Sequence, residues 1–168
     1  MPCYLFTYHS YDSWMPDRDE GYRRRDDIGV LPANRPLANI YRAQAATKVV
    51  FLTSAIQRLV VEELLVAREK QDFRLHYLAT ESTHIHALVS WKHAATWTKM
   101  CGSIRSSITR RLNRVYGTRE WLSEGASARR VVCDVHFRQV YDTYLPDHRG
   151  WKWSETEGWI PPRDGENA

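Results

Sequence analysis

Apolar residues recur along this chain with two periods, one of two residues and one of three to four. Alternation and β-branched or aromatic residues predict strands over 3–11, 73–80, 84–91 and 127–133. Apolar positions three or four apart predict helices over 37–46, 54–70, 94–116 and 135–145. This order predicts an α+β fold: a ferredoxin-like βαββαβ antiparallel sheet with helices on one face, plus one further C-terminal helix.

Polar residues and prolines predict where the helices begin and end. Ser54 and Gln57 have the spacing of a capping box at the start of the first long helix. Asp134 is expected to cap the last helix. Pro146 should end it, because the residue before a proline disfavours helical dihedral angles.

One domain over residues 1–150 accounts for these elements, followed by a C-terminal tail over 151–168. The chain has 168 residues, of which 43% are hydrophobic, enough to bury a core. Asp, Arg, Gly and Pro dominate residues 12–36, which predicts a long inserted surface loop. This loop is either a solvated excursion or a basic arm that contacts a phosphate backbone.

Charge and cysteine content indicate which partners and which cellular compartment to expect. The formal net charge is +4, which is compatible with nucleic-acid binding but weak support on its own. The three cysteines form no CxxC pair, so neither a disulfide framework nor a zinc knuckle is indicated. No apolar run approaches the roughly 18 residues of a membrane span, and the first residues lack an export signal. We therefore expect a reducing, cytoplasmic setting and no membrane partner.

Two histidines lie two residues apart on the strand predicted over 84–91. Period-2 alternation places His84 and His86 on one face and the apolar Ile85 and Ala87 on the other. Two imidazoles that converge in this way suit two ligands of one metal ion. The alternative is that both are ordinary polar residues on the open face of a half-buried strand.

The last predicted helix supplies a nucleophile and a third ligand. Tyr144 and His148 are four residues apart, the spacing of neighbours on one helical face. With a divalent cation on the histidines, the Tyr144 oxygen can attack phosphorus, expel a 3′-oxygen and form a phosphotyrosine. Pro146 lies between the two residues, and a helix break there would keep His148 from the metal. Tyr141 is a second candidate nucleophile, but the residue four positions after it is Leu145, which binds no metal.

Arginines near these elements are candidates for contacts with phosphates. A basic row on a helix is otherwise a solvated face. The set comprises Arg105, Arg110, Arg111 and Arg114 on the helix over 94–116, and Arg129 and Arg130 on the strand over 127–133.

These motifs resemble those of a known family. His84-Ile85-His86 resembles the His-hydrophobic-His motif of HUH endonucleases. Tyr144-x-x-x-His148 resembles the motif of their single-tyrosine branch, the insertion-sequence and REP-associated tyrosine transposases, in which a polar residue four positions after the tyrosine completes the metal site. The resemblance covers about residues 5–148. It implies Mg²⁺ or Mn²⁺, single-stranded DNA that often carries a hairpin, a 5′-phosphotyrosine intermediate, frequently a homodimer, and action at the bacterial nucleoid.

The expected function is that of a metal-dependent single-stranded DNA endonuclease and strand transferase. Two alternatives stay open. One is a catalytically silent module of the same fold that binds single-stranded or hairpin nucleic acid. The other is a metal hydrolase that uses His84, His86 and a carboxylate. The first reading is favoured because a tyrosine with a ligand four residues later is superfluous for binding alone.

Overall fold

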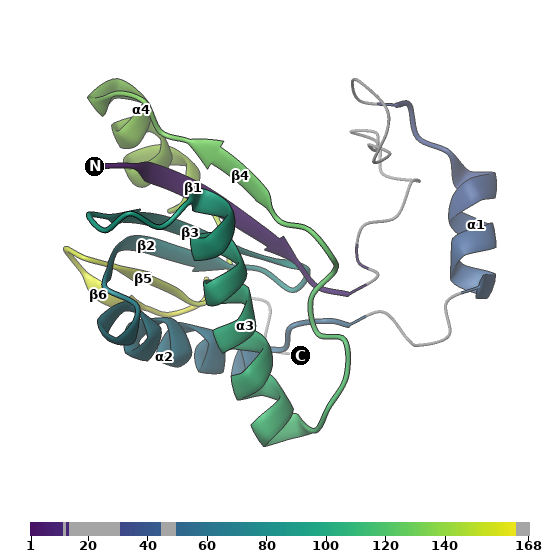
Figure 1. Cartoon of the computed structure of the whole chain (residues 1–168). Coiled ribbons are helices and arrows are strands. Elements are labelled where there is room, and N and C mark those ends of the chain that lie inside the picture. Colours follow the sequence, from purple (N-terminus) through teal and green to yellow (C-terminus); the bar gives the residue numbers. More distant parts are fainter. Residues whose placement is uncertain (12, 14–30, 45–49, 164–168) are drawn as a thin grey trace.

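A six-stranded antiparallel sheet forms the centre of the molecule (Figure 1). The structure is a computed structural model that describes residues 1–11, 13, 31–44 and 50–163. Along the sheet the strands follow the order β4-β1-β3-β2-β5-β6. Their bounds are β1 Cys3–His9, β2 Phe73–Thr80, β3 His84–Trp91, β4 Ser127–Arg130, β5 Lys152–Ser154 and β6 Gly158–Ile160.

Four α-helices accompany the sheet within the described residues, which makes the fold α+β as predicted. Along the chain, α1 and α2 lie between β1 and β2, and α3 lies between β3 and β4, while α4 runs on into a π-helical turn at Gln139–Tyr144. Residues 12 and 14–30, most of the expected long loop, lie outside the described residues. The helix bounds are α1 Arg35–Gln44, α2 Ser54–Lys70, α3 Trp97–Tyr116 and α4 Asp134–Arg138.

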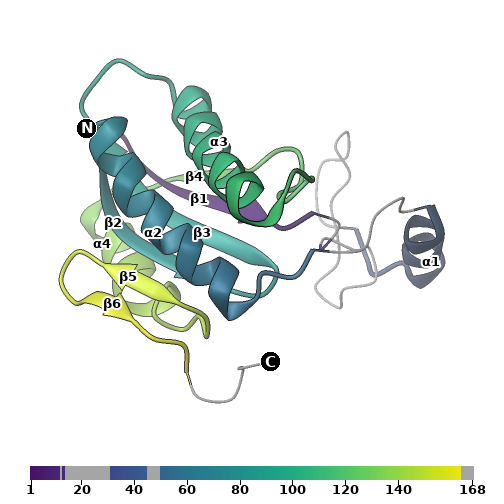
Figure 2. The ribbon, with the colours of Figure 1, turned by 90° about the horizontal axis from the view of Figure 1, so that it is seen from below.

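The sheet is buried on both faces. Ile85, Ala87 and Val89 of β3 join the larger core, which α2 and α3 cover. Leu88 faces the other way and packs in a smaller core with Val140 of the π-helical turn. Figure 2 shows α2 and α3 on one side of the sheet and α4 on the other. The predicted alternation of β3 is therefore confirmed, and the histidine face is the one that α4 covers.

The predicted caps of two helices are wrong by one residue. Thr53, not Ser54, is the N-cap of α2, and its side chain accepts a hydrogen bond from the Ile56 N–H. Gln57 forms no capping box, because its amide donates to the Leu52 carbonyl instead. At α4 the N-cap is Cys133 and Asp134 is the first helical residue.

The expected tail contributes two strands. β5 pairs with β2, and β6 pairs with β5, both antiparallel. Trp153 of β5 is buried in the larger core, with the Arg68 guanidinium 5.0 Å above its ring. The sheet thus extends to Ile160, ten residues beyond the predicted end of the domain.

Two expectations about the setting can be compared with the structure. Cys3, Cys101 and Cys133 are all free thiols, consistent with the expected absence of a disulfide framework. Among the described residues, every helix is too short or too polar to pass through a bilayer.

Candidate active site

Three imidazoles meet on the α4-covered face of the sheet. His84 and His86 project from β3, and His148 comes from the turn that follows the π-helical segment. Their candidate ligand atoms all lie within 4.8 Å of one another. The ring centroids of His86 and His148 are 4.5 Å apart, and those of His84 and His86 are 4.8 Å apart. Three nitrogen donors this close can hold a metal ion.

Burial keeps His86 neutral. Its side chain is almost inaccessible, and desolvation lowers its pKa to about 2, with the neighbouring histidines adding to the shift. Nδ1 of His86 lies 2.8 Å from the Thr7 hydroxyl on β1. When Nδ1 donates its proton to that oxygen, Nε2 keeps its lone pair for a ligand.

Hydrogen bonds set the tautomer of His148. Its Nδ1 lies 3.0 Å from the carbonyl oxygen of Tyr144 and 3.2 Å from that of Leu145. Both partners are acceptors, so Nδ1 must carry the proton and Nε2 must be the nitrogen with the lone pair. This arrangement is the one that a metal-binding histidine requires.

The pairing of Tyr144 with His148 comes from a helix end rather than from a continuous helical face. The Leu145 N–H bonds the Val140 carbonyl, five residues back, as in a π-helix. Pro146 then has no N–H to donate, and the chain leaves the helix in a turn. The turn folds His148 back over the last carbonyls, with its ring centroid 5.0 Å from that of Tyr144. The helix break expected at Pro146 therefore brings the two side chains together.

The C-terminal hairpin holds this turn in place. Buried Lys152 on β5 donates from Nζ to the His148 carbonyl, 2.5 Å away. Burial lowers the pKa of Lys152, and the charge of Arg163 adds to that shift. Arg163 donates to the Pro146 carbonyl, 2.9 Å away, and its backbone N–H bonds the Arg149 carbonyl. The hairpin that sequence reasoning treated as a tail thus positions the third histidine.

Gly150 closes the same turn against β2. Its N–H donates to the Thr80 carbonyl at 3.1 Å. A Cβ at this position would lie 2.3 Å from that carbonyl oxygen and from Oε1 of Gln57. Only glycine fits this approach. Glu81, which follows β2, accepts a 2.7 Å hydrogen bond from the Arg149 N–H in the same turn.

Tyr144 lies beside the histidines and is partly exposed. Its Oη is 3.3 Å from Nε2 of His86, and 45% of the residue is exposed. Burial raises the pKa of the Tyr144 hydroxyl, and the positive charge of Arg129 opposes this rise. Tyr141 points elsewhere: its hydroxyl is 2.9 Å from Oγ1 of Thr156, and its ring stacks on Phe137. Of these two candidate nucleophiles, Tyr144 is the one whose hydroxyl lies beside the histidines.

The six arginines predicted to contact phosphates do not share one face. The helix α3, which carries four of them, packs with α2 on the face of the sheet opposite the histidines (Figure 2). Arg105 there donates to the Leu122 carbonyl at 3.2 Å, which fixes the loop after α3. In β4, Arg129 pairs with Leu5 on the histidine side, whereas Arg130 pairs with Tyr4 on the opposite side.

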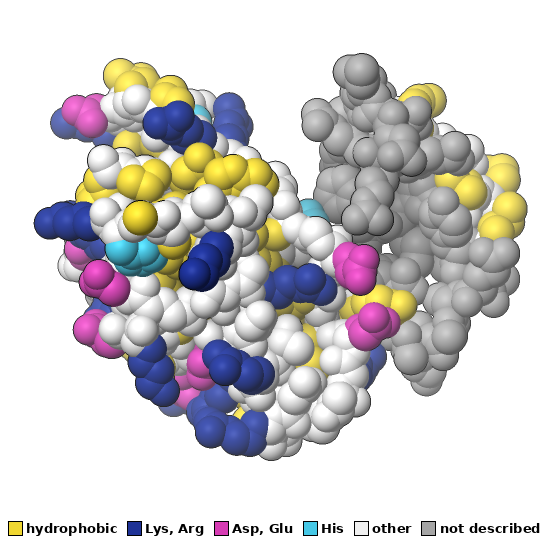
Figure 3. Space-filling model, viewed as in Figure 1, with side chains coloured by type: hydrophobic (Ala, Val, Ile, Leu, Met, Phe, Trp, Pro, Cys, Tyr) yellow, Lys and Arg dark blue, Asp and Glu magenta, His cyan; other side chains and the backbone are white. Residues whose placement is uncertain are grey.

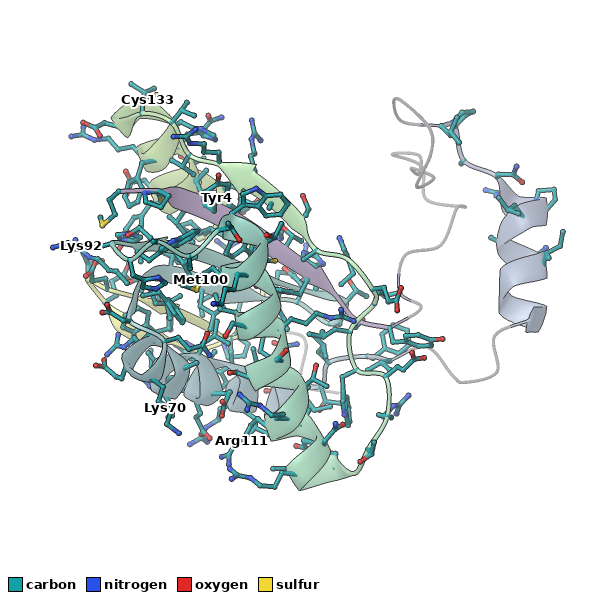
Figure 4. All side chains as sticks on the ribbon, viewed as in Figure 1. Tyr4, Lys70, Lys92, Met100, Arg111 and Cys133 are labelled. Carbon is teal, nitrogen blue, oxygen red and sulfur yellow. The ribbon has the colours of Figure 1, made fainter. Side chains whose placement is uncertain are left out.

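A groove of about 690 Å³ between α2 and α3 contains the remaining three arginines of α3. Figure 4 labels Lys70 and Arg111 beside it, and Figure 3 shows basic and acidic side chains intermixed on this face. Glu62 lies 3.8 Å from the Arg111 guanidinium, so part of the positive charge is compensated. The three groove arginines are Arg110, Arg111 and Arg114.

Sequence reasoning missed three polar side chains near the site. Thr7 contacts His86 directly, and Lys152 contacts the His148 backbone. His9 on β1 pairs with His84 in the sheet, with their rings 6.0 Å apart. A strand-pairing register would have revealed Thr7 and His9, since they sit opposite the motif histidines. No local pattern marks Lys152.

No family model and no curated protein matches the sequence. Among solved structures, it is similar to a REP-associated tyrosine transposase bound to a REP hairpin. The TM-score is 0.48 and the sequence identity 9%, over 86% of this chain and 64% of that one. The chain therefore spans less than two thirds of that protein's length. A similarity this low shows no shared family, and the function must be argued from the site itself.

Proposed function

We propose that this protein is a metal-dependent single-stranded DNA endonuclease and strand transferase that acts through Tyr144. One observation carries the proposal: the hydroxyl of a partly exposed tyrosine lies 3.3 Å from one imidazole of a three-histidine cluster. A nucleophile next to a metal-binding cluster is the arrangement that phosphoryl transfer requires. The proposed fold is ferredoxin-like, with β5 and β6 added at one edge.

Each side chain has a defined role in the proposed reaction. His84, His86 and His148 would hold the cation, which would supply positive charge near a non-bridging phosphoryl oxygen. Because Nε2 of His86 has one lone pair, it would not both ligate a cation and accept a hydrogen bond from the Tyr144 hydroxyl. The phenol loses its proton to water, and its oxygen forms a bond to phosphorus.

The second half of the reaction conserves the phosphoester. As the bond from Tyr144 to phosphorus forms, the bond to the 3′-oxygen breaks, and that oxygen takes up a proton. The 5′ end stays attached to the protein as a phosphotyrosine. A 3′-hydroxyl can later attack the same phosphorus and release Tyr144, so cleavage and strand joining are one reversible step.

The donor set bears on which cation binds. Mg²⁺ prefers oxygen ligands in near-octahedral geometry, whereas imidazole nitrogens suit transition metals. All three ligands in this site are histidines. The motif resemblance implies either Mg²⁺ or Mn²⁺. Of these two ions, we propose Mn²⁺ as the better match to three histidines.

The nucleic-acid partner and the assembly state belong to the same proposal. Arg129, on the histidine side of the sheet, is the arginine placed to meet DNA at Tyr144. The α3 arginines are proposed to contact DNA that reaches the opposite side, as a hairpin stem would. A homodimer is proposed from the motif resemblance alone.

A trapped covalent intermediate tests the proposal. Wild-type protein is incubated with labelled single-stranded DNA pools and Mn²⁺, then denatured. An adduct should form, Tyr144→Phe should abolish it, and the matched Tyr141→Phe should retain it. If Tyr144→Phe forms the adduct as well as wild type does, Tyr144 is not the nucleophile. If DNA binds but no adduct forms with any metal, the silent binding module is the better account.

A further inference from the structure

A small cavity lies on the β4 side of Tyr144, and besides Tyr144 itself the proposed function assigns a role to only one of its lining residues, Arg129. Its volume is about 280 Å³. We call it the Arg129 pocket. Its polar lining comes from β1, β4, α4 and the π-helical turn, and its apolar lining consists of Leu5 and Val140. The polar residues are Thr7, Ser127, Arg129, His136, Gln139 and Tyr144.

Several polar groups of the Arg129 pocket have unused hydrogen-bonding capacity. The side chains of Ser127, Arg129 and Gln139 form no hydrogen bond or ion pair with the described part of the chain. Nε2 of His136 is buried and also lacks a partner there. A guanidinium, a hydroxyl and an amide around one small cavity are donors that suit a phosphate group.

The cavity on the other side of Tyr144 has the opposite character. It measures about 470 Å³, and Glu81, Asp147 and two of the motif histidines line it. Tyr144 and Gln139 line both cavities. The nucleophile therefore stands between a side with carboxylates and imidazoles, which suits a cation, and a side with a guanidinium, which suits an anion.

We propose that the Arg129 pocket binds a phosphate of the substrate strand next to the scissile one. This inference rests on the proposed function, since it takes single-stranded DNA as the ligand. The scissile phosphate belongs beside Tyr144 Oη and the histidines, which leaves the Arg129 pocket for a neighbouring phosphate. Arg129 contacts that phosphate, while Ser127 and Gln139 donate hydrogen bonds to it. The pocket thereby holds the strand in register with the nucleophile.

Salt-dependent binding tests this role without chemistry. A labelled single-stranded oligonucleotide is titrated into Tyr144→Phe protein in EDTA at several salt concentrations. Each phosphate contact to a single strand contributes about −0.7 to the slope of log K against log salt. Adding Arg129→Met should lower the slope's magnitude by about that amount, and Arg129→Lys should restore most of it. Ser127→Ala should weaken binding without changing the slope.

Arg130→Met is the matched comparison, since it removes the same charge from the same strand on the opposite face. The proposal is overturned if Arg129→Met leaves the slope unchanged, or if both substitutions change it equally. Thermal unfolding of each variant separates a loss of contact from a loss of fold. If the Tyr144→Phe protein binds no DNA at all, it is the proposed function that fails.

Discussion

Nδ1 of His148 donates its proton to the carbonyl oxygen of Tyr144, 3.0 Å away. One hydrogen bond thus links the proposed third ligand to the backbone of the proposed nucleophile. In the neutral imidazole this hydrogen bond leaves the lone pair on Nε2, the nitrogen available to a ligand. Any movement of the helix end that carries Tyr144 should therefore move His148 with it.

Removing the third ligand should weaken metal binding. We expect His148→Ala to lower Mn²⁺ affinity at least about 100-fold, since loss of a supporting contact alone typically costs 10–100-fold. Isothermal titration calorimetry of the metal-free protein measures it. His93→Ala is the control, because His93 bonds the Gln71 carbonyl away from the cluster. Equal Mn²⁺ affinities for wild type and His148→Ala would show that His148 is not a metal ligand.

Lys152 should act on metal binding through the turn that it holds. We expect Lys152→Met to lower Mn²⁺ affinity about 10-fold or more, because the His148 carbonyl loses its buried donor. Lys152→Arg should recover part of the loss, since it restores a cationic donor. Metal titration and thermal unfolding are measured on the same samples. A fall in melting temperature with unchanged metal affinity would show that Lys152 stabilises the fold only.

Gly150→Ala should destabilise the protein by about 1–3 kcal/mol, as overpacking in a tight site does. The new Cβ would lie 2.3 Å from the Thr80 carbonyl oxygen, and backbone atoms cannot easily yield. Gly102→Ala in α3 is the paired control, since nothing lies within 4 Å of its Cβ position. That substitution should stabilise by up to about 1 kcal/mol. Urea unfolding of both variants gives the two values, and the same sign for both would contradict this account.

The stability of the fold should fall as the solution becomes more acidic, in part because of His76. Its Nε2 bonds the Ser90 hydroxyl at 2.8 Å, and burial lowers its pKa, with the charge of Arg74 adding to the shift. The unfolded chain therefore binds a proton at a pH where the folded protein does not, so stability is lost below about pH 6.5. Urea unfolding at pH 8 and pH 5 measures the loss. It should be smaller in His76→Gln, and a loss as large as in wild type would exclude His76 as a source.

Local patterns predicted the strand that carries two of the three histidines and the helices that pack on its other face. The strand β3 and the helices α2 and α3 follow from apolar periodicity, which depends only on neighbouring residues. The placement of His84 and His86 on one face follows from the same alternation. The strands β5 and β6, three residues each, gave no such signal because a short strand is defined by its pairing partner.

The sequence by itself determined which side chains are available: two histidines on a strand, and a tyrosine with a histidine four residues later. The tertiary structure decided what surrounds them. Thr7 reaches His86 through strand register, and Lys152, four residues after His148, is held near the His148 carbonyl by the pairing of β5 with β2. The sequence predicted that a helix break at Pro146 would keep His148 away from the metal. In the structure the break lets His148 fold back onto the helix end. Periodicity is a property of neighbouring residues, whereas a metal site is assembled by contacts between residues distant in sequence.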